Sequence, residues 1–168
     1  MATAENRVRP RLTRQDWIHS IRTTLGAVIS LEIARLFKLP EAYWASITAI
    51  ILMQSTLGAA LTVSEYRLAR TALGAAMGAL LGTYFPPNVW IYAAGILVLG
   101  IICATLRLDR AAYRFAGITL AIVLLVTRVS PAWEIALHRF FEVSVGIGVG
   151  LILTAIWPGD GPAGPAGR

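Results

Sequence analysis

Residues 41–82 read EAYWASITAIILMQSTLGAALTVSEYRLARTALGAAMGALLG, and this stretch decides the fold. It begins with an aromatic pair, Tyr43 and Trp44, and continues as an apolar run around the polar residues 54–56. Two arginines, Arg67 and Arg70, then precede regularly spaced glycines. A lipid-embedded helical hairpin has this order: an interfacial aromatic anchor, an apolar span, a basic turn and a closely packed second helix.

The composition extends this interpretation to the whole chain. Of its 168 residues, 57% are hydrophobic and 14% are charged, and the mean hydropathy is +0.67. Soluble domains carry about 45–50% apolar and about 25% charged residues. We therefore expect an all-α, polytopic membrane protein with six transmembrane helices. The first apolar run is long and more follow it, which argues against a cleaved signal peptide.

Alternating apolar and polar segments divide the chain. The expected spans cover residues 21–37, 42–63, 68–85, 89–106, 112–127 and 135–157, with a basic turn at residues 64–70 and a candidate break in the polar middle of the second span. Residues 1–16 are expected to form a disordered basic arm. Residues 17–158 form the six-helix membrane domain, and residues 159–168 form a disordered Gly/Pro tail.

The net charge of +6 indicates membrane topology rather than a nucleic-acid partner. The cations sit in short turns between apolar runs, and they are concentrated in alternate segments, including the N-terminal arm. Because cytoplasmic loops carry the excess of Lys and Arg, both termini are predicted to be cytoplasmic. The expected location is the inner membrane of a bacterium.

A weak internal repeat is also present. Arg67, Gly74 and Gly78 recur 72 residues later as Arg139, Gly146 and Gly150, and residues 47–48 match residues 118–119. Three spans per block would insert the second block upside down, which tends to place a functional site at the midplane between the halves. The alternative is chance, because Arg and Gly are common here.

The candidate substrate pathway is built from cations and aromatic residues. Arginine near hydrocarbon is costly, so it is retained where it pairs or lines water, and its planar fork matches a carboxylate. The alternatives are that the arginines mark the cytoplasmic headgroups and that the aromatic residues form an interfacial belt. The predicted pathway residues are Arg67, Arg70, Arg139, Tyr43, Trp44 and Gln54.

Two acidic residues lie within the predicted spans. Glu32 and Glu142 each lie three residues from an arginine, Arg35 and Arg139. They are candidates for proton coupling, since a buried carboxyl group can bind a proton. The alternative is a neutralising pair within one helix.

Glycines at a spacing of four predict close helix packing, within or between protomers. They are Gly74, Gly78 and Gly82 in the third span and Gly146 and Gly150 in the sixth. The sequence contains no metal-ligand cluster, no nucleophile–base set and no phosphate-binding loop. We therefore expect no enzyme activity, no cofactor and no metal.

These motifs resemble the membrane block of the fusaric acid resistance-like family, which groups with the aromatic acid exporters and is related to plant aluminium-activated malate transporters. The resemblance covers about residues 21–158. This sequence departs from the family pattern at Arg70, a position where the family usually has glycine. The matching residues are Tyr43-Trp44-Ala45 with Thr48, the run 54–58, Arg67 with Thr71, Gly74 and Gly78, and Arg139 through Gly146 to Trp157-Pro158.

The resemblance implies export of small organic, often aromatic, carboxylates, driven by protons. Many family members carry two such blocks, so a single block implies a homodimer or higher homo-oligomer in the lipid bilayer. Two alternatives stay open: a passive organic-anion channel of the malate-transporter type, and a membrane scaffold subunit that transports nothing.

Overall fold

The computed structural model describes residues 14–53, 56–108, 110–126 and 130–157. Within these ranges the chain is all-helical and has no strand, which confirms the predicted class. The six helices are α1 (Arg14–Leu36), α2 (Tyr43–Met53), α3 (Leu57–Tyr84), α4 (Val89–Thr105), α5 (Arg110–Leu125) and α6 (Ala132–Ile156).

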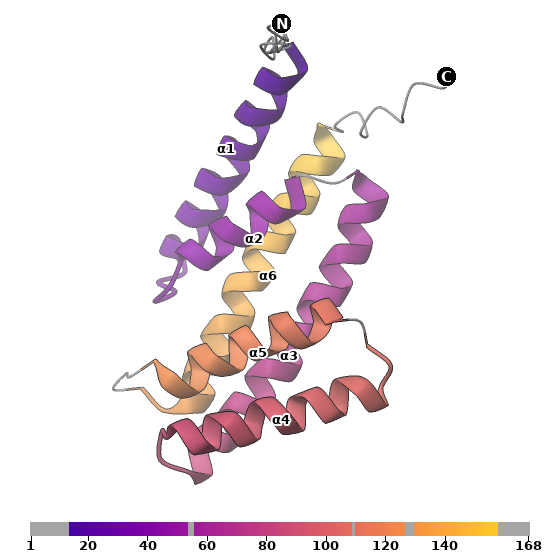
Figure 1. Ribbon diagram of the computed structural model, residues 1–168. Helices are drawn as coiled ribbons and strands as arrows, with labels where there is room; N and C mark the ends of the chain where they lie inside the picture. The colour runs from indigo at the N-terminus through magenta and orange to yellow at the C-terminus, as the bar shows by residue number, and fades with distance from the viewer. Residues whose placement is uncertain (1–13, 54–55, 109, 127–129, 158–168) are drawn as a thin grey trace, which may run out of the picture.

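The two long helices α3 and α6 pack against each other and form the centre of the molecule (Figure 1). The short helix α2 packs on α6, and α5 packs on α3. The outer helices complete each side, with α1 against α2 and α6, and α4 against α5 and α3. Helices α2 and α5 do not pack on each other; each packs separately on the α3–α6 pair.

Glycines allow the central helices to approach their short partners closely. Gly74 lies directly against the backbone of Ala116 in α5, and Gly146 lies directly against the backbone of Ala45 in α2. One turn further on, a Cβ atom added to Gly78 would lie 2.7 Å from the Cβ of Val123. A Cβ added to Gly150 would lie 3.0 Å from the Cβ of Leu52, and one added to Gly82 would lie 2.6 Å from that of Ala132.

Helices α1 and α4 end in the same kind of turn. Lys38 after α1 and Arg107 after α4 have left-handed backbone conformations, with φ of 56° and 54°. The amide of Leu39 then donates to the carbonyl of Ala34 at 3.0 Å, and the amide of Leu108 donates to that of Cys103 at 2.9 Å. Both pairings are the six-to-one hydrogen bond that closes a helix C-terminus.

The predicted second span and the basic turn after it are wrong. The chain breaks at the polar cluster, where α2 ends at Met53 and α3 begins at Leu57, so residues 64–70 lie inside a 28-residue helix. No proline or glycine interrupts residues 59–73, and the Ser64 hydroxyl donates to the Ala60 carbonyl one turn earlier. Residues 14–16, which we expected to belong to the basic arm, form the first turn of α1.

Helix length limits what can cross a bilayer. Of the described helices, only α6 is both long enough and apolar enough to span one; α2, α4 and most of α5 are apolar but shorter. The 11 residues of α2 reach about 16 Å, against about 30 Å of hydrocarbon. Six membrane crossings therefore stay a prediction.

Candidate functional site

Two buried arginines lie on the central helices. Arg67 in α3 is 6% exposed and Arg139 in α6 is 3% exposed. Each guanidinium lies over an aromatic ring of a short helix, Arg67 at 4.8 Å from the Phe115 centroid and Arg139 at 3.4 Å from the Trp44 centroid. The ring faces attract the cations electrostatically, which offsets part of the cost of burying them.

The two arginines differ in their polar partners. Arg139 donates to the carboxylate of Glu142, buried beside it, with Nη1 and Oε2 3.4 Å apart. Among the described residues, Arg67 donates only to a neutral group, the hydroxyl of Thr48 in α2, at 3.2 Å. In the same part of the chain, four buried nitrogen atoms have no hydrogen-bond partner: Nε and Nη1 of Arg67, Nε of Arg139 and the indole Nε1 of Trp44. All four are nitrogen donors, so a group rich in acceptors would complete the site.

Charged side chains from other helices hold both ends of α2. At its start, the Glu142 carboxylate accepts a hydrogen bond from the amide of Glu41 at 2.8 Å. At its end, Arg22 of α1 donates to the carbonyls of Met53 and Trp157, both at 2.7 Å. An anion at a helix N-terminus and a cation at its C-terminus both complement the helix dipole. The site residues on α2 are thereby fixed in place.

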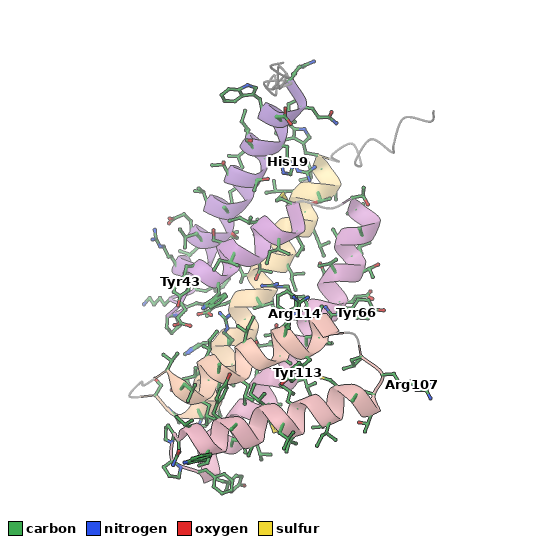
Figure 2. All side chains as sticks on the ribbon, viewed as in Figure 1. His19, Tyr43, Tyr66, Arg107, Tyr113 and Arg114 are labelled. Carbon is green, nitrogen blue, oxygen red and sulfur yellow. The ribbon has the colours of Figure 1, made fainter. Side chains whose placement is uncertain are left out.

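An open groove of about 600 Å³ lies next to Trp44. Arg114 lies on the side of α5 that faces the middle of the molecule, whereas Arg107 points away from it (Figure 2). The groove thus combines aromatic walls with an exposed guanidinium and borders the ring that Arg139 contacts. Its lining residues are Trp44 of α2, Tyr92 and Ile96 of α4, and Tyr113, Arg114, Gly117, Ile118, Ala121 and Ile122 of α5.

Two further predicted pathway residues, Arg70 and Tyr43, are more exposed than the central arginines. Arg70 is half-buried, with its guanidinium 5.1 Å from the ring centroid of Tyr66. Tyr43 is 50% exposed, and its hydroxyl donates to the Glu41 carboxylate at 2.9 Å. Its ring centroid lies 5.6 Å from that of Trp44. Gln54 lies outside the described residues.

The two acidic candidates are in different environments. Glu142 is 1% exposed and lies beside Arg139. Glu32 is an exposed residue of α1, with its carboxylate 2.8 Å from Arg35 on the same helix. The structure therefore brings Glu142 to Arg139 and leaves Glu32 paired with Arg35 on α1. Across the described ranges, no group of three potential metal ligands is present.

Sequence reasoning missed Arg22 and the groove residues on α4 and α5. Arg22 was not among the predicted site residues, yet it is one of four buried residues of α1 at a spacing of four, with Gly26, Ser30 and Ala34. That spacing was the available signal, since small residues mark a packed helix face. Tyr92, Tyr113 and Arg114 carry no motif of their own, because only the fold brings α4 and α5 beside Trp44.

Comparison with known proteins supports the resemblance. Residues 24–153 match the family described as fusaric acid resistance protein-like. Over 162 residues the chain is 31% identical to the uncharacterized transporter YdhK of Escherichia coli K12, which covers 91% of this chain and 24% of that protein. YdhK of Salmonella typhimurium is 30% identical over 165 residues, with the same coverage.

A second relative is the inner membrane protein YeeA of Escherichia coli K12, 31% identical over 150 residues, which cover 84% of this chain and 41% of that protein. The chain thus spans about a quarter of the length of YdhK and about two-fifths of YeeA. No solved structure matches. Because the family match covers more than half of the sequence and carries the motifs quoted above, this chain belongs to the fusaric acid resistance protein-like family.

Proposed function

We propose that this chain is an inner-membrane transporter of small organic carboxylates, which pass between α2 and α5 and are bound by the central arginines. The names of its relatives, a transporter and an inner membrane protein, support this class. The observation that carries the proposal is the set of unpaired donors on Arg67, Arg139 and Trp44. A carboxylate supplies acceptors and charge together, and charge-assisted hydrogen bonds are the strong ones.

Lipid as the solvent is supported by the distribution of side-chain sizes. Leu36 and Trp90 are each 80% exposed and Ile156 is 75% exposed, whereas alanines such as Ala45, Ala49 and Ala60 fill the helix contacts. Large apolar groups on the outside are unusual in a soluble monomer. All six helices then belong to the membrane domain, with α2 as a half-length helix buried among the others. The cytoplasmic position of both termini stays a prediction.

An inverted repeat of α1–α3 and α4–α6 is part of the proposal. Its support is reciprocity: Gly74 meets Ala116 and Thr119, whereas Gly146 meets Ala45 and Thr48. An aromatic ring of each half also contacts the arginine of the other half: Trp44 contacts Arg139, and Phe115 contacts Arg67. Since such repeats tend to place the binding site at their shared axis, the two arginines lie where a substrate site is expected.

An aromatic carboxylate is the proposed substrate, because the groove places Tyr113 and Tyr92 near Arg114 and Trp44. Glu142 is the proposed proton site, since it is buried and forms a pair with Arg139. The homodimer stays a prediction from the sequence resemblance.

Flux from proteoliposomes tests the proposal. The purified chain is reconstituted with trapped benzoate, and efflux is followed with and without an imposed pH gradient. We expect efflux that the gradient accelerates and that Arg67→Gln lowers at least tenfold. Arg107→Gln, which removes an exposed cation from the α4–α5 turn, should leave efflux unchanged.

The same assay separates the alternatives. A passive channel would give a steady current in planar bilayers that follows the benzoate gradient and ignores pH. A scaffold would release benzoate no faster than protein-free vesicles do, and that result would exclude transport. The buried, unpaired nitrogens of Arg67 argue against a scaffold, because a purely structural interior pairs its charges.

A further inference from the structure

The two halves differ in charge at one pair of equivalent positions. Arg67 and Arg139 lie 72 residues apart on α3 and α6, and three residues beyond them the chain has Arg70 in one half and Glu142 in the other. Apart from that difference their surroundings correspond, with an aromatic ring of a short helix against each guanidinium. Within the described residues, the second half therefore supplies a carboxylate for its arginine and the first half does not.

Glu142 is fixed where it lies. One of its oxygens faces Arg139 at 3.4 Å, and the other accepts the amide hydrogen of Glu41 at 2.8 Å. Moving this carboxylate away would leave a buried cation uncompensated and would uncap α2, and both changes are costly. A free carboxylate also competes poorly with a tethered one, whose effective concentration is high.

Within the described residues, Arg67 has no such counter-ion. Its side chain is 6% exposed, its only hydrogen bond goes to the Thr48 hydroxyl, and its Nε and Nη1 atoms have no partner among the described residues. Because Glu142 already occupies Arg139, Arg67 is the better placed of the two arginines to accept an incoming anion.

We propose that the substrate carboxylate binds Arg67, in the position that Glu142 takes beside Arg139, so that one chain holds one anion and supplies the second carboxylate itself. This inference rests on the proposed transport function. In this proposal the Glu142 carboxylate takes the place of a ligand at Arg139. Position 70 has no carboxylate, so the difference between positions 70 and 142 sets the number of anions bound per chain. Arg67 is the anion-binding residue, and Arg139 binds Glu142 instead of substrate.

Binding stoichiometry tests the inference, with benzoate as the probe. Isothermal titration calorimetry on the full chain in lipid–detergent micelles should give one benzoate per chain. Arg67→Gln should weaken that binding about tenfold or more, because it removes the charge-assisted hydrogen bonds. The matched control Arg107→Gln removes one arginine charge at an exposed turn and should bind like the wild type.

Glu142→Gln gives the sharper result. A glutamine at position 142 still has an oxygen to accept the Glu41 amide hydrogen, but it leaves Arg139 without a carboxylate. The number of benzoates bound per chain should rise from one to two. The double variant Arg67→Gln/Glu142→Gln should again bind one, now at Arg139. Because this double variant regains binding, it also shows that loss in Arg67→Gln is not misfolding.

Three outcomes would overturn the inference: two equal sites in the wild type, unchanged binding in Arg67→Gln, or no gain in Glu142→Gln. Its failure is distinguishable from failure of the proposed function. Benzoate flux that depends on Arg139 but not on Arg67 would leave transport standing and remove the inference. One-site binding at Arg67 without any flux would support the binding inference and exclude the proposed transport function.

Discussion

Arg67 in α3 and Arg139 in α6 are both buried and both lie against an aromatic ring, but their polar partners differ. Among the described residues, Arg139 has a carboxylate on its own helix, and Arg67 has only a hydroxyl from a neighbouring one. In the transport mechanism proposed above, Arg139 has a structural use and Arg67 has a binding use. That proposal assigns the difference to the residue three positions further along each helix, Arg70 or Glu142.

The largest effect is expected from removing the paired arginine. Arg139→Gln leaves Glu142 buried without its cation, and such a loss costs about 3–5 kcal/mol. Arg67→Gln removes a buried cation that has no carboxylate, so it should be neutral or stabilising. Reversible unfolding in mixed SDS micelles, followed by tryptophan fluorescence, measures both. Equal losses would refute the contrast between the two sites.

The second effect concerns the end of α2. Arg22→Met removes two hydrogen bonds from a charged donor to buried carbonyls and should cost about 3 kcal/mol. Residue 91 of α4 takes the equivalent place in the second half and is an isoleucine, so Ile91→Met should cost under about 1 kcal/mol. Hydrogen exchange should also accelerate at the last turn of α2 in Arg22→Met alone. Unchanged protection from hydrogen exchange at that turn would contradict the role of Arg22 in holding the end of α2.

The third effect compares glycines of the two central helices, α3 and α6. Gly146→Ala places a methyl group against the Ala45 backbone and should cost about 1–3 kcal/mol, and Gly74→Ala should cost as much against Ala116. Gly148→Ala meets nothing within 4 Å and should stabilise α6 by about 0.5–1 kcal/mol. Thermal unfolding of the three variants measures this. A loss in Gly148→Ala matching the other two would point to a helix-wide cause instead of contact.

The smallest effect separates the two acidic candidates. Glu32→Gln breaks an exposed pair and should change stability by less than about 1 kcal/mol. It should also leave benzoate efflux and its pH dependence intact, because Glu32 is not near the central arginines. The measurement is efflux at a series of external pH values. A flattened pH profile in this variant would return Glu32 to the proton pathway.

The sequence predicts the second half of the fold better than the first. The helices expected at residues 89–106, 112–127 and 135–157 agree closely with α4, α5 and α6. Residues 64–70 misled the interpretation, because arginine within a helix and arginine in a turn give the same positive-inside signal. Only burial separates the two cases, and burial depends on which helices pack against α3.

For the candidate site, too, some residues could be proposed from the sequence and others could not. Arg67, Arg139 and Trp44 were singled out on chemical grounds, because a cation or an aromatic pair in an apolar run requires a reason. Tyr92, Tyr113 and Arg114 were not found, since their role arises from contact between segments far apart in the chain. Glu142 was found as an ion-pair partner, but its bond to α2 depends on a three-dimensional fold.

The double attachment of α2 bears on how the chain enters the membrane during synthesis. The residues that hold its two ends come from opposite ends of the sequence, Arg22 in α1 and Glu142 in α6. A ribosome releases α6 after helices α1 to α5, so both ends of α2 are held only once α6 has been made. Assembly then cannot proceed strictly helix by helix, because α2 reaches its final contacts after three later helices have followed it.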